Sequence, residues 1–492
     1  MGKHRIRILG TTALVALAVG TTQAVAGGLA LREQSAWGEG TSYAGVAAGG
    51  SLSAMFWNPA TITQTGKLAI EASTSVLFPQ SSQTGTATFL TPPLSALTPF
   101  GFTDQTPNST EAAVLPSGYV SMQLNDRIWF GLSFNSPFGL STNFENPGWA
   151  GAFYAQSSSL RTYNGTPTVA IKITDWLSVG GGLQIQYAEP HLMFATGATA
   201  PGTPTLGLLT GHGWTVGWTA GVTLTPTPWT QIGLGYRSAL NQEIDGNFVA
   251  GAAGSTAITT VRWPDSASLG VRQGITSNLT VLGTVEWTGW KRIGTSVVNQ
   301  SNGSPTLAPN GLPVVLPFQF NDGWFYSAGL EYVHSPSWIF RGGVGFEKSP
   351  ITDQVRIPLL PDDDRMWYSI GATNRITPSI SVDLAYSFVD VKTAPLNVVP
   401  GNPWFNGAVS YVGTSHASVS IFSIGVKYKL DEPPPPGRNP RISGLGMKPA
   451  RGPGRTGALG ICAIAARPRR FVLSSGGAPA SRALRRPRSS AD

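Results

Sequence analysis

The sequence predicts an all-β membrane protein, a fourteen-stranded antiparallel β-barrel, and three observations support this fold class. Short runs between residues 66 and 430 alternate apolar with polar side chains. Tight turns and long connections follow one another between these runs. No run approaches the roughly 20 apolar residues that a transmembrane helix needs. A closed barrel of strands is then the remaining way to cross a membrane with every backbone hydrogen bond made.

The chain begins with the features of a secretory signal peptide. Lys3, Arg5 and Arg7 precede a largely apolar stretch, and residues 24–26 read Ala-Val-Ala, which is a small-residue cleavage site. We expect residues 1–26 to be removed and the mature chain to begin at Gly27. Export combined with an amphipathic barrel indicates the cell outer membrane of a Gram-negative bacterium as the location.

The alternation is clearest in residues 379–388. Every even position there carries a large apolar side chain, from Ile380 to Phe388, whereas every odd position is small or polar. Successive side chains of a strand point to opposite faces, so this strand has one apolar and one polar face. A soluble β-sandwich alternates in the same way, so a single strand does not decide between the two folds.

The connection lengths favour the barrel. Tight turns fit at six places, and seven long connections lie between them, which together imply fourteen strands. Outer-membrane barrels have short periplasmic turns, long outer loops and an even number of strands. We expect the long connections near residues 79–113, 140–160, 189–212, 239–260, 291–317, 349–366 and 389–416.

The net charge of +8 does not indicate a polyanionic partner, because the excess lies in the signal peptide and in residues 431–492. We therefore expect no nucleic acid partner. Residues 431–492 are rich in Arg, Gly, Pro and Ala, which predicts a disordered Arg/Pro-rich tail outside the barrel. A basic arm that binds polyanions and a frameshift product are the alternatives. The single Cys462 excludes an intramolecular disulfide framework.

The sequence contains no pattern of a catalytic, metal or cofactor site. Gly-x-Ser-x-Gly, His-Glu-x-x-His and Walker sequences are absent, and the five His residues have no metal-ligand spacing. Asp362, Asp363 and Asp364 lack the spaced ligands and the Gly of a calcium loop, so we expect a solvated or salt-bridged loop. We expect no enzyme activity, no cofactor and no metal.

Several motifs together point to a family. Residues 56–60 read Phe-Trp-Asn-Pro-Ala, residues 233–238 read Gly-Leu-Gly-Tyr-Arg-Ser, and residues 286–290 read Glu-Trp-Thr-Gly-Trp. Residues 361–365 read Pro-Asp-Asp-Asp-Arg and precede Trp367. From residue 27 to 430 the chain resembles the FadL family of outer-membrane transporters, which take up long-chain fatty acids and, in close relatives, aromatic hydrocarbons.

The resemblance implies a plugged barrel. Residues 27–65, with Asn58, Pro59 and Ala60, would form an N-terminal hatch inside a barrel of residues 66–430. In that family a hydrophobic compound is captured by outer loops, passes to a pocket and leaves sideways into the membrane at a kink of the third strand. Here Pro137, Phe138 and Gly139 are the candidates for that lateral opening, because Pro and Gly interrupt a strand. They equally well begin the second loop.

Apolar residues in the third long connection are candidates for capturing the hydrophobic substrate. Exposed apolar loops are unfavourable unless they bind something. The alternative is that these loops only fold over one another as a cap. The candidate residues are Leu192, Met193, Phe194, Leu206, Leu208 and Leu209.

Strand parity places Arg237, Arg341 and Glu347 in the lumen. Such an Arg could bind a substrate carboxylate, or these charges could pair and tie the hatch to the wall. Residues 187–191 lack the Lys or Arg that fatty-acid carriers can place in this region, which favours a neutral hydrocarbon over a fatty acid. The main rival interpretation is a general or substrate-specific porin for small polar solutes. We expect a monomer surrounded by outer-membrane lipid and lipopolysaccharide.

Overall fold

The computed structural model describes residues 28–90, 102–106, 112–144, 149–200, 203–251, 253–308, 311 and 313–430. The expected signal peptide and the expected tail lie outside the described residues and stay predictions. Residues 91–101 and 107–111 of the first expected long connection also lie outside the described residues.

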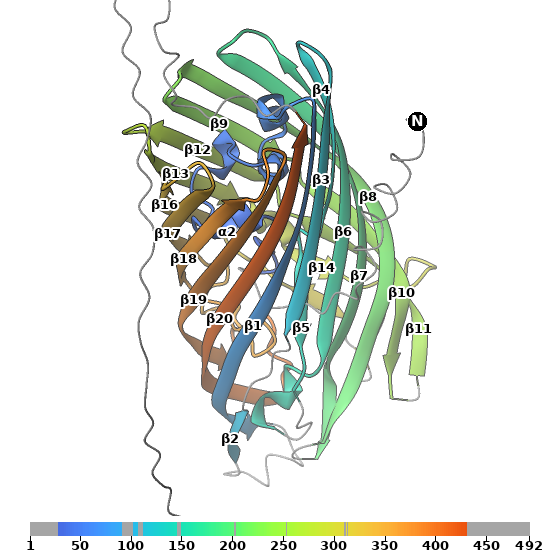
Figure 1. The fold of residues 1–492 in the computed structure, drawn as a ribbon. Helices are drawn as coiled ribbons and strands as arrows, with labels where there is room; N and C mark the ends of the chain where they lie inside the picture. The colour runs from blue at the N-terminus through green and yellow to red at the C-terminus, as the bar shows by residue number, and fades with distance from the viewer. Residues whose placement is uncertain are drawn as a thin grey trace, which may run out of the picture. The chain divides into compact units, whose positions relative to one another are not determined.

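Fourteen antiparallel strands form the barrel and confirm the predicted fold (Figure 1). The first and last strands pair from Leu68↔Leu430 to Phe89↔Val409 and close it. Three barrel strands are interrupted and therefore have two labels each. In chain order the barrel strands are β1 (Leu68–Phe89), β3 (Ala113–Asn125), β4 (Ile128–Asn135) with β5 (Gly139–Thr142), β6 (Ser158–Lys172), β7 (Leu177–Ala200), β8 (Thr203–Thr227), β9 (Thr230–Arg237) with β10 (Leu240–Ala250), β11 (Ala253–Trp263) with β12 (Ser266–Gly274), β13 (Leu279–Thr288), β16 (Gly323–Val333), β17 (Trp338–Lys348), β18 (Arg365–Arg375), β19 (Ile380–Val398) and β20 (Val409–Leu430).

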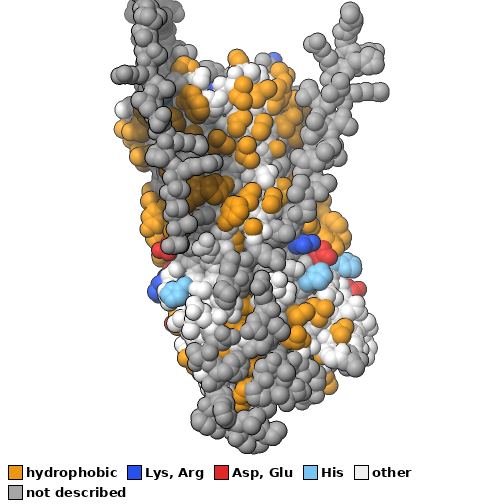
Figure 2. Space-filling model, turned by 60° about the horizontal axis from the view of Figure 1, so that its bottom comes forward, with side chains coloured by type: hydrophobic (Ala, Val, Ile, Leu, Met, Phe, Trp, Pro, Cys, Tyr) orange, Lys and Arg blue, Asp and Glu red, His pale blue; other side chains and the backbone are white. Residues whose placement is uncertain are grey.

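The predicted alternation places apolar side chains on the outside of the wall and small or polar ones in the lumen. On β19, Leu384 is 54% exposed while its neighbour Asp383 is 1% exposed. On β20, Phe422 and Ile424 face outward while Ser423 is buried. Hydrophobic side chains spread over the wall, and charged and His side chains appear beyond them toward the end with the long connections (Figure 2). Among the described residues no helix has the length and apolarity to cross a membrane.

The expected long connections are partly wrong. The strands β7 and β8 continue as a paired hairpin as far as Ala200↔Thr203, and β10 and β11 pair as far as Ala250↔Ala253. Residues 189–200, 203–212 and most of 239–260 are thus strand and not loop, and so are residues 79–89 of the first expected connection. Their backbone groups still pair beyond the lipid, where the side-chain alternation is no longer required. The remaining small elements are β2 (Phe102–Thr106), η5 (Ala150–Phe153), η6 (Trp290–Ile293), β14 (Thr295–Val297) and β15 (Val315–Pro317).

The segment before β1 fills the lumen as a hatch. It contains α2 (Ala36–Glu39), η1 (Val46–Ala48), η2 (Leu52–Phe56) and η3 (Pro59–Gln64), and nearly all of its side chains are buried. Two side chains start its helical turns. The hydroxyl of Ser35 accepts a hydrogen bond from the Gly38 amide at 2.9 Å, and the Oδ1 atom of Asn58 accepts one from the Ala60 amide at 3.0 Å. Pro59 follows Asn58 at the first helical position, where its missing N–H is harmless.

Glycines of the wall let the hatch backbone touch the barrel backbone. A Cβ atom on Gly343 of β17 would lie 2.1 Å from the carbonyl oxygen of Thr41, and one on Gly235 of β9 would lie 1.8 Å from that of Trp57. Any side chain at these lumen positions would push the hatch away from the wall. The hatch is therefore seated on the strands by backbone contact.

We predict that Gly343→Ala displaces the hatch. Overpacking costs about 1–3 kcal/mol, so the undocked population should rise about tenfold or more. Single-channel recording in planar bilayers should then show frequent ion currents. The matched control is Gly342→Ala on the outer face, where the nearest atom to a Cβ is 3.8 Å away. Equal currents from both variants would contradict the backbone contact as the cause.

Candidate functional site

An apolar cap lies over the hatch at the end with the long connections. Its buried core is drawn from η5, from residues 290–320, 349–364 and 396–411, and from the upper ends of several strands. Aromatic rings interlock in it. The Phe144 and Trp149 rings stack with centroids 4.5 Å apart, and the Phe318 ring lies edge-on to both Phe320 and Trp404 at 5.6 Å. The loops thus form a packed layer.

The cap contains an apolar cavity of about 370 Å³. Its lining includes Leu29 from the start of the hatch and Leu140 from β5, which places the cavity against both elements. Lys, Arg, His, Asp and Glu are absent from its described lining. Convergent apolar walls of this kind suit the nonpolar part of a ligand. The principal apolar lining residues are Phe153, Leu160, Leu192, Leu209, Trp263, Ile293, Leu316, Phe318, Leu360 and Trp404.

The structure divides the six residues considered for substrate capture. Leu192 and Leu209 are register partners in the β7–β8 hairpin, and both line the cavity. Met193 and Leu208 form the next pair, so strand alternation turns them to the opposite face. Leu206 shares that opposite face. Phe194 lies in β7, and its side chain is outside the described residues.

Most of the cavity lining was missed in the sequence. Much of it comes from η5, from residues 313–318 and from residues 403–407, which have no repeating pattern and contain only the three-residue strand β15. A usable signal was present in residues 312–318, which read Leu-Pro-Val-Val-Leu-Pro-Phe. An apolar run interrupted by Pro is too irregular for a strand and too apolar for an exposed loop.

The third strand breaks at Pro137, where the interrupted ladder is taken up by the start of the hatch. The amide of Leu31 donates to the Pro137 carbonyl and the amide of Gly139 donates to the Leu29 carbonyl, each at 2.9 Å. Ala30 and Phe138 face each other between these two bonds. In the described strands β3 pairs with β4 from Gly118 onward but not with β5. A gap in the wall therefore lies between β3 and β5, and beside it residues 29–31 of the hatch pair with the third strand as a wall strand would.

Gln34 binds both sides of this gap. Its side-chain amide donates to the Ser136 carbonyl at 2.7 Å and accepts from Asn135 Nδ2 at 3.1 Å. Its backbone carbonyl accepts from the hydroxyls of Ser117, at 3.0 Å, and Tyr119 on β3. One hatch residue thus joins β3 to the broken third strand.

Asn58 of the expected hatch motif also joins the hatch to the wall. Its Nδ2 atom donates to the carbonyls of Ala47, at 2.7 Å, and Val222 on β8, at 2.9 Å. Its Oδ1 atom caps η3, as described above. Pro59 and Ala60 are buried, and a Cβ on Gly180 would lie 2.6 Å from the Ala60 nitrogen.

Two of the three lumen charges form ion pairs, and both of them also contact the hatch. Arg341 pairs with Glu331 at 2.8 Å and lies over the ring of Trp37, a hatch residue. Glu347 pairs with Arg32 of the hatch at 3.4 Å. Arg237 is different. It donates to the Phe56 carbonyl at 3.1 Å and to two amide oxygens, and no carboxylate of the described residues pairs with it.

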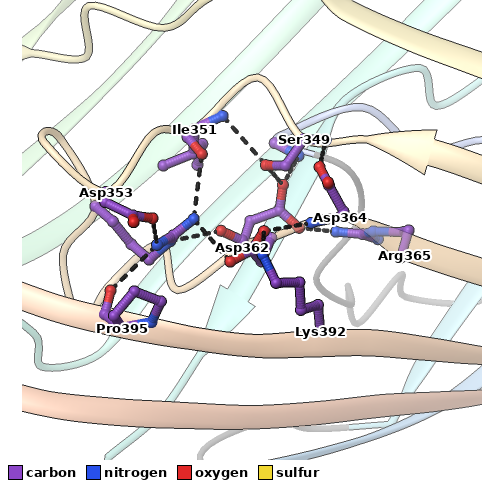
Figure 3. Close-up of polar contacts among 11 residues, drawn as sticks. Ser349, Ile351, Asp353, Asp362, Asp364, Arg365, Lys392 and Pro395 are labelled. Carbon is purple, nitrogen blue, oxygen red and sulfur yellow. Dashed lines mark hydrogen bonds and ion pairs between the residues drawn. The ribbon is translucent and has the colours of Figure 1, made fainter.

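The three consecutive acids form a salt-bridged loop, as expected (Figure 3). Asp362 pairs with Arg365, and Asp363 pairs with Arg356 at 3.1 Å. Asp362 also accepts a hydrogen bond from the Gly28 amide at 3.0 Å, so this loop holds the start of the hatch. Among the described residues no cluster of His, Cys, Asp and Glu could hold a metal ion.

A closed barrel filled by its own N-terminal segment, with an apolar cavity above that segment, defines a plugged outer-membrane transporter. The chain belongs to the family of outer membrane protein transport proteins (OMPP1/FadL/TodX), which its residues 17–430 match. It is therefore a transport protein of the Gram-negative outer membrane and not an enzyme.

Curated relatives match over most of their length. The chain is 24% identical to the long-chain fatty acid transport protein of Escherichia coli (strain K12), covering 80% of this chain and 96% of the relative. It is also 24% identical to outer membrane protein P1 of Haemophilus influenzae (strain ATCC 51907 / DSM 11121 / KW20 / Rd), covering 87% and 100%.

Solved structures share the fold. A Pseudomonas aeruginosa FadL homologue has a TM-score of 0.73 at 22% identity, covering 82% of this chain and all of the homologue. The Ralstonia pickettii toluene transporter TbuX has a TM-score of 0.55 at 17% identity, covering 80% and 97%. At these identities the likeness establishes the architecture and leaves the substrate open.

We predict that Gln34→Ala loosens the start of the hatch. The substitution removes the side-chain hydrogen bonds to the Ser136 and Leu31 carbonyls and from Asn135, and it leaves these buried polar groups without that partner, which costs about 1–3 kcal/mol. Hydrogen–deuterium exchange of residues 29–31 and of Gly139 should accelerate about tenfold or more. Gln80→Ala, on the exposed face of β1, is the control and should leave exchange there unchanged. Unchanged exchange in Gln34→Ala would show that the Gln34 side chain does not hold residues 29–31 in place.

We also predict that hatch docking weakens as the pH rises. Burial raises the pKa of the Glu33 carboxyl to about 8 from 4.5, and the charge of Glu39 adds to the rise. The docked hatch keeps this proton while an undocked one releases it. Docking stability is thus full below about pH 4.5 and is lost through about pH 8.

The undocked fraction of the hatch can be measured with one spin label on the hatch and one on a tight turn, in a Cys462→Ser background. The distance distribution between the two labels reports it. The undocked fraction should grow from pH 5 to pH 8.5. In Glu33→Gln this growth should be much smaller, because the group no longer titrates. A pH-independent distribution in the parent chain would contradict the prediction.

Proposed function

We propose that the chain takes up a hydrophobic compound, either a long-chain fatty acid or an aromatic hydrocarbon, by passive transport through the outer membrane. The two substrate classes are those that the names of its relatives give, a long-chain fatty acid transport protein and a toluene transporter. The observation that carries the proposal is the apolar cavity lined by the cap and by the start of the hatch. A pore for polar solutes would need an open polar lumen, whereas here the hatch fills it.

The proposed route has three stages. The compound enters through the cap, and Leu192 and Leu209 contact it in the cavity. The start of the hatch then withdraws from the broken third strand. Finally the compound passes the gap at Pro137, Phe138 and Gly139 and enters the membrane sideways. Support for this last stage comes from the gap between β3 and β5 and from the few hydrogen bonds that close it.

Growth and uptake test the proposed function. A deletion strain should grow poorly on limiting oleate or on limiting toluene, and the intact gene should restore growth on the same compound. Unimpaired growth of the deletion strain on both compounds at limiting supply would contradict the proposal.

Filling the cavity should abolish transport. We predict that Ala308→Trp, a substitution on the cavity lining, lowers uptake of the restoring compound about tenfold, because the indole occupies the space of the ligand. Ala328→Trp on the lipid face of β16 adds the same side chain outside the cavity and should retain uptake. Equal uptake by the two variants would place the ligand elsewhere.

A reversible crosslink tests lateral release. Ala30 and Phe138 are a non-hydrogen-bonded antiparallel pair, whose Cα separation of about 4.5 Å permits a disulfide. We predict that Ala30→Cys with Phe138→Cys, in a Cys462→Ser background, blocks uptake when oxidised and recovers it on reduction. Each single substitution serves as a control. Full uptake by the oxidised protein would exclude withdrawal of residues 29–31 as a transport step.

A further inference from the structure

Arg237 is an exception among the buried cations of the barrel. The other buried cations in the described part of the chain each lie within ion-pair distance of at least one carboxylate, and these are Arg272, Arg341, Arg356, Arg365 and Lys427. Arg237 is 9% exposed, and its guanidinium has only neutral partners. Burying an unpaired charge is costly, so a residue of this kind calls for an explanation.

Arg237 lines a second, smaller cavity of about 70 Å³ on the hatch side of the first. We call the first cavity, in the cap, the upper cavity and the second the lower cavity. The lining of this cavity includes Pro137 and Phe138 of the break and Ala30 and Leu31 of the hatch. It therefore lies at the gap through which the proposed route leaves the barrel. The Arg237 side chain reaches it from the end of β9 and lies 4.3 Å from the centroid of the Phe56 ring.

The two cavities are neighbours, and of the two only the second has charged residues in its described lining. Leu29 lines the upper cavity, and the next residues, Ala30 and Leu31, line the lower one. Trp263 of the upper lining pairs in register with Leu240 of the lower lining. Phe138 stacks on Trp263 with centroids 4.6 Å apart, so one aromatic contact separates an apolar space from a space that contains a cation.

The acids of the lower cavity leave the charge of Arg237 available. Glu286 pairs with Arg32 at 2.8 Å, and Glu347 pairs with the same guanidinium at 3.4 Å. The third acid, Glu33, holds its proton over the neutral range because burial raises its pKa to about 8. Glu347 also lies within ion-pair distance of Arg365, at 3.9 Å, so both carboxylates have cationic partners other than Arg237.

We propose that Arg237 is a specificity-determining residue that receives the carboxylate of an amphipathic substrate when its apolar tail lies in the upper cavity. The inference rests on the proposed transport function and selects the long-chain fatty acid class within it. A guanidinium binds a carboxylate by charge-assisted hydrogen bonds, which exceed those to the amide oxygens of Asn164 and Gln184 in strength. The absence of a cation from residues 187–191 then gives no reason to expect a neutral hydrocarbon, because the cation is supplied from β9.

The alternative is that Arg237 only stabilises the hatch, through its hydrogen bond to the Phe56 carbonyl. A pair of ligands with the same chain separates the two roles. Oleate and oleyl alcohol differ in the head group alone, so loss of hatch stabilisation weakens both, whereas loss of a carboxylate receptor weakens oleate selectively.

The experiment measures binding of radiolabelled oleate and oleyl alcohol to the purified full chain at pH 7.5 by scintillation proximity. In the parent protein oleate should bind more tightly. Arg237→Gln should lower the oleate to oleyl alcohol affinity ratio by about tenfold to a hundredfold, the range for a hydrogen bond to a charged group. Arg237→Lys keeps the charge and should retain most of the ratio.

A second variant tests the inference independently in case Arg237→Gln does not fold. Gln184→Glu places a carboxylate of the same shape on an existing Arg237 contact and should lower the same ratio by pairing with the guanidinium. An unchanged ratio in both Arg237→Gln and Gln184→Glu overturns the inference, and so does an equal loss of both ligands. If the parent protein binds oleyl alcohol or toluene without preferring oleate, only this inference fails. If it binds none of them, the proposed function fails.

Discussion

The pairing of residues 29–31 with the broken third strand is the contact on which the rest of the molecule depends. The hatch, the apolar cavity and the gap in the wall all meet there, because Leu29 lines the cavity while Leu31 bonds to Pro137. Pro137 cannot donate to a ladder, and the strand on its far side does not pair with β3. The hatch supplies the missing partner. The same backbone pairing therefore completes the wall at its gap and fixes the start of the hatch in the lumen.

Two kinds of contact hold the hatch elsewhere. Glycines such as Gly343 bring its backbone against the strands, and the buried Glu71 carboxylate of β1 accepts hydrogen bonds from the Ser51 hydroxyl and the Ser53 amide. Removing such a donor leaves a buried carboxylate unsatisfied, which is costly. The lower hatch is thus strongly fixed. Its first residues are held by a few neutral hydrogen bonds and by Asp362 to Gly28, so motion is expected to begin at that end.

The sequence predicted the strands well and the cavity poorly, for a physical reason. Lipid imposes a period of two on every membrane strand, so the fourteen strands and the inward direction of Arg237, Arg341 and Glu347 were readable. Beyond the lipid this constraint ends. The hairpin of β7 and β8 was accordingly taken for a loop, and the cavity walls near Phe318 and Trp404 had no period to reveal them. The pairing of Ala30 with Phe138 joins residues far apart in the chain, which no local pattern encodes.

The free energies of the contacts at the start of the hatch explain how the hatch can open without an energy source. Four hydrogen bonds of 3.1 Å or shorter join residues 29–34 to the third strand, through Leu31, Gly139 and both ends of the Gln34 amide. At a net 0.5–1.5 kcal/mol each, they contribute about 2–6 kcal/mol. Burial of an alkyl chain is worth about 0.8 kcal/mol per methylene, so roughly three to eight methylenes offset them. Burial of a hydrophobic ligand at the hatch start can therefore offset the loss of these four hydrogen bonds. A small polar solute gains no such term, so the closed state excludes it without a separate gate.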